Sequence, residues 1–315
     1  MAQFIAVDLG GTNIRVAYFP KAELPPSTQS KTPTHASEGP DAVIERLCQA
    51  IDEQLPTDQS DLSIGIGAPG PLDPRHGLVL KAVNLPGWEM IPLKSILETR
   101  FVCPVFVGND ANLAALGEWR FGAGQGTSDL IYLTISTGIG GGVIIDGKLL
   151  VGNWGLGAEL GHMTVDPNGP ICSCGKHGHL EAVASGPAIA RRAMARIEAG
   201  EFSSLTDQLK TSGSLTAVDV GDAAQAGDPL ACEVIEEAAE YIGRHMADLA
   251  HAFNPEIFVI GGGVSQLGPL LFKPIERAVE ANVMSLAYMM NLQISPAALG
   301  DDAGLIGAMV LASQE

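Results

Sequence analysis

The stretch FIAVDLGGTNIRVAYF (residues 4–19) carries the pattern that decides the fold. Its apolar residues 4–7 predict a β-strand, Gly10 and Gly11 allow a tight turn, and residues 14–19 alternate as a returning strand. Small polar side chains surround this turn: Asp8, Thr12 and Asn13. Successive backbone amides at such a turn can bind a phosphate oxygen. An ordinary hairpin without a ligand could, however, have the same sequence pattern.

The pattern returns in LIYLTISTGIGGGVII (residues 130–145), where a strand over 130–135 leads into a glycine-rich turn over 136–142. Two copies predict a duplicated architecture with one copy in each domain. A third glycine cluster, IFVIGGG (residues 257–263), predicts a buried strand, a flexible turn and a helix that begins near Pro269. Corners of this kind commonly receive a nucleotide.

None of the three loops contains the lysine of a Walker A sequence or a G-x-G-x-x-G fingerprint with its acidic partner. We therefore expect ATP to be held by backbone amides, by hydroxyls such as Thr12 and Thr137, and by a magnesium ion. This mode suits a chain with a formal charge of -18, which also opposes extended contact with nucleic acid or anionic lipid.

Length and composition indicate two domains of ordinary size, since the chain has 315 residues and 46% of them are apolar. No run of about 18 uninterrupted apolar residues occurs, and no basic region precedes an apolar one at the N-terminus. The five cysteines are an odd number and mostly scattered, which argues against a disulfide framework. We expect a cytoplasmic protein without membrane contact.

A strand-to-helix junction lies in VFVGNDANLAALGEW (residues 105–119). Asn109 and Asp110 are both good N-cap residues, because their side chains accept hydrogen bonds from amides at a helix start. The functional hypothesis is that one of them caps the helix while the other faces a cleft. Further along, residues 198–216 are polar and weakly patterned and predict a surface excursion.

The stretch GHMTVDPNGPICSCGKHGHLE (residues 161–181) holds two cysteines and three histidines at short spacing. Thiolates and imidazoles in a loop rich in Gly and Pro favour a tetrahedral zinc site over two free thiols with scattered histidines. Glu159 and Glu181 bracket the loop, so a metal there would fix two acidic side chains in a polar pocket.

Taken together, the motifs resemble the ROK family of sugar kinases, repressors and related proteins over nearly the whole chain, in the family's order. The motifs are DLGGTNIR (8–15), GAPGPLD (67–73), NLPGW (84–88), GNDAN (108–112), STGIGGG (136–142), GAELGH (157–162), the cysteine loop and IGGGV (260–264). Within that family the NLPGW stretch is most similar to bacterial glucokinases.

The resemblance implies an α/β fold, an actin-like (ribonuclease H-like) two-domain sugar kinase with an interdomain cleft. We expect a small domain over residues 1–108 with a C-terminal helix over 303–315, and a large domain over 109–302 that carries the zinc loop. The implied reaction is ATP-dependent phosphorylation of a hexose, with glucose as the expected substrate and Asp110 as the general base. The alternatives are a non-catalytic sugar sensor of the repressor type, and a kinase for fructose, mannose or an N-acetylhexosamine.

The resemblance also implies the binding residues. Those expected to hold the sugar are Gly70, Asn84, Asn109, Asp110, Glu159, His162 and Glu181. Those expected to hold Mg²⁺-ATP are Asp8, Gly10, Gly11, Thr12, Asn13, Thr137, Gly138, Gly261, Gly262 and Gly263. Polyphosphate in place of ATP stays open, and the family's usual assembly is a homodimer or homotetramer.

The zinc loop departs from the family pattern C-x-C-G-x-x-G-C-x-E at one position, where His179 replaces the third cysteine. Imidazole is an acceptable zinc ligand, so the expected structural Zn²⁺ site consists of His162, Cys172, Cys174 and His179. His177 is a weaker candidate because it lies off the family position.

Overall fold

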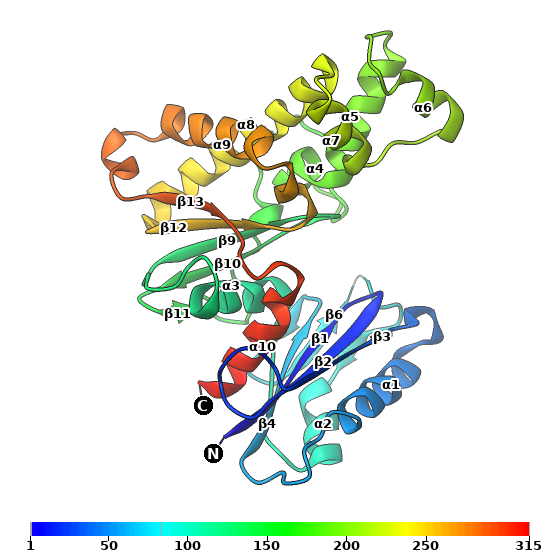
Figure 1. Cartoon of the computed structure of the whole chain (residues 1–315), viewed down its shortest axis with the longest axis vertical. Helices are drawn as coiled ribbons and strands as arrows, with labels where there is room; N and C mark the ends of the chain where they lie inside the picture. The colour runs from blue at the N-terminus through cyan, green and yellow to red at the C-terminus, as the bar shows by residue number, and fades with distance from the viewer. Residues whose placement is uncertain (1, 83, 315) are drawn as a thin grey trace. The chain divides into compact units, whose positions relative to one another are not determined.

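The computed structural model describes residues 2–82 and 84–314, which fall into two compact units (Figure 1). Unit 1 comprises Met1–Gly126, Gly142–Ala158 and Ala298–Glu315. Unit 2 comprises Thr127–Gly141 and Glu159–Ala297. Each unit contains one of the two predicted glycine turns.

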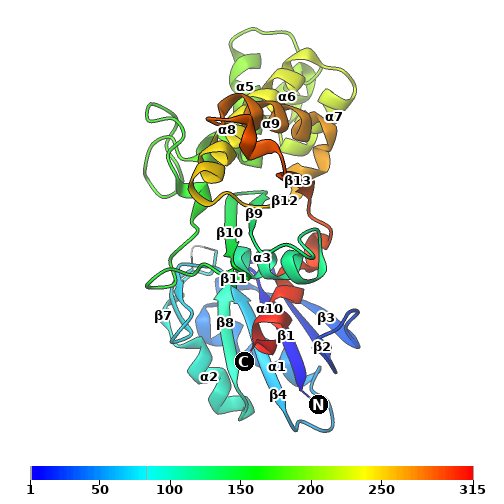
Figure 2. The ribbon, with the colours of Figure 1, turned by 90° about the vertical axis from the view of Figure 1, so that its left-hand side faces the viewer.

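The main sheet of unit 1 is built on the predicted glycine hairpin, which is confirmed. β1 (Gln3–Leu9) pairs antiparallel with β2 (Asn13–Phe19), and the N–H of Gly10 donates to the carbonyl of Asn13 at 2.9 Å. β3 (Thr28–Pro33) extends the hairpin, whereas β4 (Leu62–Ala68) is parallel to β1 and β8 (Val105–Asn109) is parallel to β4. The resulting order β3-β2-β1-β4-β8 can be followed across the lower part of Figure 2.

The two faces of this sheet are covered by different helices. On one face, alternate apolar residues of β1 pack with α1 (Pro40–Asp52) and α2 (Leu93–Phe101) in a single buried cluster. On the other face lies α10 (Ala303–Ser313), because Gly65 has no side chain: a Cβ there would lie 1.9 Å from the carbonyl oxygen of Ala308. α3 (Asp110–Phe121) packs against α10 as closely, since a Cβ on Gly307 would lie 1.7 Å from the carbonyl oxygen of Leu113. These contacts hold α3, and with it the Asn109–Asp110 junction, firmly against the sheet (Figures 1 and 2).

The buried carboxylate of Glu118 anchors two segments of unit 1 near the end of α3. Its oxygens accept the amide hydrogens of Ala123 (2.9 Å), Ala298 (3.0 Å) and Leu299 (2.8 Å), and its side chain is fully buried. A buried carboxylate with three amide donors is well compensated. The other elements of unit 1 are η1 (Ala36–Glu38), β5 (Leu72–Asp73), β6 (Leu78–Lys81), β7 (Glu89–Ile91), β11 (Lys148–Leu149) and η5 (Gly300–Asp302).

The second sheet has the order β11-β10-β9-β12-β13. β9 (Leu130–Ile135) and β10 (Ile139–Ile145) are neighbours that flank the second glycine turn, so the duplicated pattern is confirmed. β12 (Ile257–Gly261) runs parallel to both β9 and β13 (Gln293–Pro296). The third glycine cluster therefore begins at Gly261, the last residue of this central, buried strand.

Helices make up most of the rest of unit 2. α8 (Pro229–Phe253) begins where Asp228 accepts the amide hydrogen of Ala231 at 2.9 Å, and ends at Asn254 in the left-handed region, ahead of Pro255. The remaining elements are η2 (Leu160–His162), α4 (Leu180–Ala184), α5 (Gly186–Glu198), α6 (Thr206–Ser212), α7 (Ala217–Gln225), η3 (Gly263–Leu267), α9 (Pro269–Asn282) and η4 (Leu286–Met289). The surface excursion expected over residues 198–216 thus contains a short helix, α6, which its polar composition did not reveal.

The compact units do not coincide with the domain boundaries that we expected from the sequence. Residues 109–126 and 142–158 belong to unit 1, because α3 packs on α10 and the glycines at 142 and 155 approach unit 1 segments. The division into a small domain over 1–108 with 303–315 and a large domain over 109–302 remains a prediction. Among the described residues, no helix has both the length and the apolar character that a bilayer span requires.

Candidate active site

The glycine hairpin of unit 1 borders a hollow of about 430 Å³. The lining residues are Asp8, Gly10, Gly11, Thr12, Asn13, Arg15, Gln29, Lys31 and Asp301. All five ATP-binding residues expected from this part of the sequence are therefore together. Arg15 and Lys31 add positive charge beside amides that can bind an anion.

The surroundings of the Asp8 carboxyl group have opposing effects on its pKa. Burial raises the pKa of Asp8, the guanidinium of Arg15 at 4.0 Å lowers it, and the nearby Asp301 raises it again. Arg15 also donates to the carbonyl of Asp301 and to the carboxylate of Asp302. Oxygen atoms such as those of carboxylates are the ligands that Mg²⁺ prefers, so the Asp8 carboxylate is a suitable partner, directly or through a bound water, for a hydrated magnesium ion beside the hairpin.

A residue that sequence reasoning missed, Thr34, holds the hairpin tip in place. Thr34 is fully buried; its hydroxyl donates to the carbonyl of Gly10 (2.7 Å) and its N–H donates to the carbonyl of Thr12 (2.8 Å). Its own carbonyl accepts a hydrogen bond from Arg46 (2.6 Å). These partners lie 12 to 24 residues away in the chain, so no local pattern could indicate the role.

Asn109 and Asp110 divide the start of α3 between them. Asn109 is the N-cap, and its Oδ1 accepts the amide hydrogens of Ala111 (3.0 Å) and Asn112 (3.3 Å). Asp110 is the first helical residue and is exposed, with Oδ1 accepting from Ala111 at 2.8 Å. The capping task therefore falls mainly to Asn109, while the carboxylate of Asp110 reaches the surface.

Two glycines of unit 1 bring candidate residues close together. A Cβ on Gly11 would lie 2.7 Å from the carbonyl oxygen of Asn84, so the hairpin tip touches the NLPGW loop directly. A Cβ on Gly70 would lie 2.9 Å from the side-chain nitrogen of Asn109. Within unit 1, the hairpin tip thus lies against Asn84, and Gly70 lies against Asn109.

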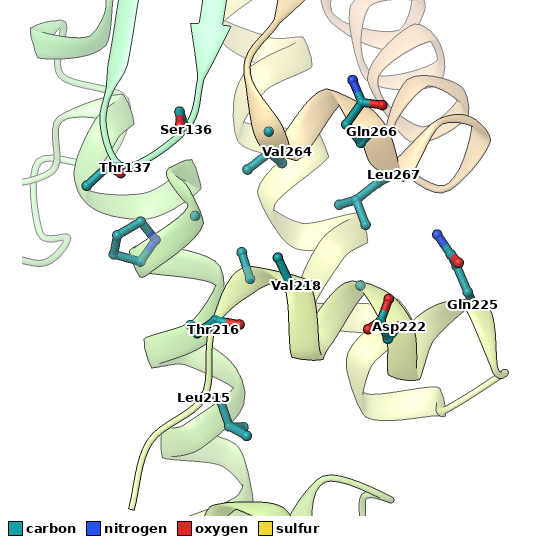
Figure 3. Close-up of a pocket in the computed structure, with 16 residues that line it drawn as sticks. Ser136, Thr137, Leu215, Thr216, Val218, Asp222, Gln225, Val264, Gln266 and Leu267 are labelled. Atoms are coloured by element: carbon teal, nitrogen blue, oxygen red, sulfur yellow. The ribbon is translucent and has the colours of Figure 1, made fainter. Parts of the chain in front are cut away.

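The second glycine turn borders a hollow of about 460 Å³ within unit 2 (Figure 3). Figure 3 shows Ser136 and Thr137 at one side, with Val264, Gln266 and Leu267 of η3 on another. The other lining residues are Gly186, Pro187, Ala190, Leu215, Thr216, Ala217, Val218, Gly221, Asp222, Gln225 and Gly263. Apolar walls with a few polar groups are typical of a site for a planar ring such as a nucleobase.

Of the ATP candidates expected in this unit, Thr137 and Gly263 line the hollow, whereas Gly138, Gly261 and Gly262 do not. Gly262 has φ 83°, and a Cβ there would lie 2.4 Å from the carbonyl oxygen of Ile135. Its role is therefore to let the chain turn tightly after β12. Sequence reasoning did not identify the residues of α5 and α7 that line the hollow, because residues 215–222 contain no recognisable nucleotide-binding motif.

The four expected zinc ligands come together in the cysteine loop. The ligand atoms of His162, Cys172, Cys174 and His179 all lie within 4.8 Å of one another. Cys172 Sγ lies 3.6 Å from His162 Nδ1, and Cys174 Sγ lies 3.3 Å from His179 Nδ1. Tetrahedral zinc with bonds of about 2.3 Å to sulfur and about 2.0 Å to nitrogen requires a separation of about 3.6 Å between S and N ligands. The donor set fits a closed structural site.

His177 is not part of this His/Cys cluster and contacts a backbone carbonyl instead. Its Nδ1 donates to the carbonyl of Gly169 at 3.1 Å, and its side chain is exposed. The ring of His179, by contrast, is buried and lies edge-on to that of His162 at a centroid distance of 5.5 Å.

The three sugar candidates of unit 2 flank this cluster. Glu159 is the exposed N-cap position of η2, and His162 is the last residue of the same turn. Glu181 is half-buried at the start of α4, where its carboxylate accepts hydrogen bonds from the N–H of Ile139 (3.1 Å) and the hydroxyl of Ser173 (2.8 Å). The cysteine loop therefore contacts Glu181 of α4 and His162 of η2 through the side chains of Cys172 and Ser173.

A family model described as the ROK family matches residues 4–315. The chain belongs to the ROK family. A glucokinase of Halalkalibacterium halodurans is 41% identical over 99% of this chain and 95% of its own length. A solved ROK glucokinase of Streptomyces griseus, in complex with glucose and AMPPNP, is 36% identical with a TM-score of 0.82 and covers 100% of both chains. A xylose repressor of Caldicellulosiruptor bescii is 35% identical over 84% of this chain and 65% of its own length.

The resemblance to the ROK family and the actin-like, two-domain α/β fold expected from the motifs are both confirmed. ROK relatives include kinases and a repressor, so membership alone does not select an activity. The glucokinase relatives match over nearly their entire length, and the repressor over about two thirds of its length.

Proposed function

We propose that this ROK protein is an ATP-dependent glucokinase that works in the cytoplasm and converts glucose to glucose 6-phosphate. The observation that carries the proposal is the exposed carboxylate of Asp110, which is the first residue of α3 and directly follows the N-cap Asn109 at the end of β8. The glucokinase relatives, which match along the whole chain, support the same activity.

Asp110 is proposed as the general base. As the 6-hydroxyl oxygen of glucose attacks the γ-phosphorus of ATP in line, the hydroxyl proton passes to the Asp110 carboxylate. The bond from that oxygen to phosphorus forms, the bond from phosphorus to the β,γ-bridging oxygen breaks, and ADP leaves with the bond electrons. A carboxylate within hydrogen-bond reach of the nucleophile is what this transfer needs from the protein.

The remaining sugar hydroxyls are assigned to the polar candidates around the two glycine-rich segments. Asn84 and Asn109 offer amide groups, and the missing side chain of Gly70 leaves room beside Asn109. Glu159 and Glu181 offer acceptors, whereas His162, with its Nδ1 at the His/Cys cluster, would offer its Nε2–H as a donor. Binding through many directed hydrogen bonds distinguishes hexoses, because a missing or inverted hydroxyl leaves a polar group unpaired.

ATP is assigned to the glycine loops. The hollow beside Thr137 would receive the base, and the N–H groups of residues 10–13, together with the side chains of Thr12 and Asn13, would donate hydrogen bonds to phosphate oxygens. Asp8 would hold the hydrated Mg²⁺, which supplies neutralisation of the triphosphate charge.

The zinc site is proposed to be architectural. His162, Cys172, Cys174 and His179 provide four protein ligands and leave no position for a reacting water. His162 and the segment that leads to Glu181 would thus be held in a fixed place by the metal.

A coupled assay of ADP release tests the proposed activity across glucose, mannose, fructose, N-acetylglucosamine and N-acetylmannosamine. Glucose should give the highest kcat/KM with ATP as the donor, and the same assay with polyphosphate tests the alternative donor. A protein that binds glucose in calorimetry but releases no ADP with any sugar would instead be a sensor of the repressor class.

A further inference from the structure

The carboxylate of Glu181 joins two loops of unit 2. Oε2 accepts the N–H of Ile139 at 3.1 Å, where the glycine turn enters β10. Oε1 accepts the hydroxyl of Ser173 at 2.8 Å and lies 3.5 Å from Cys172 Sγ. One side chain therefore spans from the cysteine loop to the turn that carries Thr137.

The glycine turn is shaped around this carboxylate. A Cβ on Gly138 would lie 2.6 Å from Glu181 Oε2, which is closer than real Cβ contacts allow. The turn is closed by the N–H of Ser136 donating to the carbonyl of Gly138 at 2.8 Å. Residues 136–138 are thus held between their own hydrogen bond and the Glu181 carboxylate.

The glycine turn has a second close contact, with the backbone of η2. A Cβ on Gly161 would lie 1.9 Å from the carbonyl oxygen of Ile139, so the backbone just before His162 rests directly on the end of the turn. The turn and the metal-ligand loop are consequently packed as one body inside unit 2.

We propose that Glu181 is a positioning residue for the nucleotide, in addition to its proposed contact with the sugar. It holds the backbone of residues 137–139 in the conformation that receives ATP, and it transmits the placement of the cysteine loop to that turn. This inference rests on the proposed function, because it takes the hollow beside Thr137 as the ATP site.

The physical reason is pre-organisation. A glycine turn that lacks its anchor samples many conformations, and nucleotide binding must then order it. Glu181→Ala also leaves the N–H of Ile139 without its acceptor. We expect Glu181→Ala to weaken nucleotide binding by about tenfold even when no sugar is present.

The test is calorimetric titration of Mg·AMPPNP into the sugar-free full chain. Glu181→Gln should retain the wild-type affinity, since its amide oxygen can still accept from Ile139 and its amide nitrogen can donate to Ser173. Glu198→Ala is the matched control: it removes an exposed glutamate at the last residue of α5, which does not line the hollow, and should leave sugar-free AMPPNP affinity unchanged.

The outcomes separate this inference from the proposed function. Equal AMPPNP affinity of the wild type and Glu181→Ala overturns the inference and leaves the kinase proposal standing. Failure of the wild type to bind AMPPNP overturns the proposed function itself. If Glu181→Ala does not fold, the exposed substitution Ser173→Ala takes its place: a loss of about two- to threefold supports the inference, and no loss overturns it.

Discussion

The side chain of Asn109 caps α3, with its Oδ1 3.0 Å from the amide nitrogen of Ala111, and Oδ1 of the exposed Asp110 lies 2.8 Å from the same nitrogen. Both residues suit a helix start, yet they occupy different positions: Asn109 precedes the helix and Asp110 is its first residue. The adjacent carboxylate can consequently serve chemistry at the helix N-terminus, where an anion is stabilised by the helix dipole.

Asp110→Asn should reduce kcat by about 10²-fold or more, because it removes the proton acceptor and keeps a side chain that suits a helix start. Steady-state kinetics with glucose and calorimetric glucose binding together measure the effect, and binding should be largely kept. Asp41→Asn, in the first turn of α1, is the matched control and should leave kcat unchanged. Near-normal turnover in Asp110→Asn would refute the assignment of the base.

Thr34→Val should raise the KM for ATP by about five- to tenfold, because the hydrogen bond from its hydroxyl to Gly10 is lost at a fully buried position. The KM for glucose should change less. Thr34→Ser keeps the hydroxyl and should restore most of the ATP affinity. Equal KM values for ATP in Thr34→Val and the wild type would show that the hairpin needs no anchor.

Metal analysis of the purified protein should give about one zinc per chain, consistent with a closed four-ligand site. His179→Ala should lower both zinc content and glucose affinity, whereas His179→Cys should preserve both. His177→Ala should do little, because His177 bonds to Gly169 instead. Loss of zinc from the His177 variant but not from the His179 variant would reverse the ligand assignment.

Stability of unit 2 should fall as the pH drops from about 6.5 to about 4, because burial lowers the pKa of His245 to about 4. In that range the unfolded chain binds the proton and the folded chain does not, so acid favours unfolding; Asp248 opposes the shift without cancelling it. The total effect is about 3 kcal/mol below pH 4.

Urea unfolding at a series of pH values measures this dependence. His245→Leu should flatten the curve between pH 4 and 6.5. His251→Gln, at an exposed position of the same helix, should retain the wild-type profile. Identical curves for His245→Leu and the wild type would mean that other groups dominate the acid transition.

Local sequence determined much of the fold and part of the site. The alternation over residues 4–19 and the glycines at its turn specify a hairpin, because strand periodicity and turn geometry are properties of adjacent residues. Asp228 with Pro229 marks the start of α8, and Asn254 with Pro255 its end, for the same reason. The cluster of two cysteines and two histidines was also predictable, since all four residues lie within 18 residues of one another in the chain.

Only the tertiary structure decided what holds these parts in place. Thr34 acts on a hairpin tip more than 20 residues earlier, and Glu181 on a turn 42 residues earlier. The hollow beside Thr137 joins α5, α7 and η3, whose lining residues carry no shared motif. Such contacts depend on where the packed core places distant segments. A hydrogen bond between remote residues leaves no periodicity in the chain, so the sequence by itself could name the binding loops but not the residues that position them.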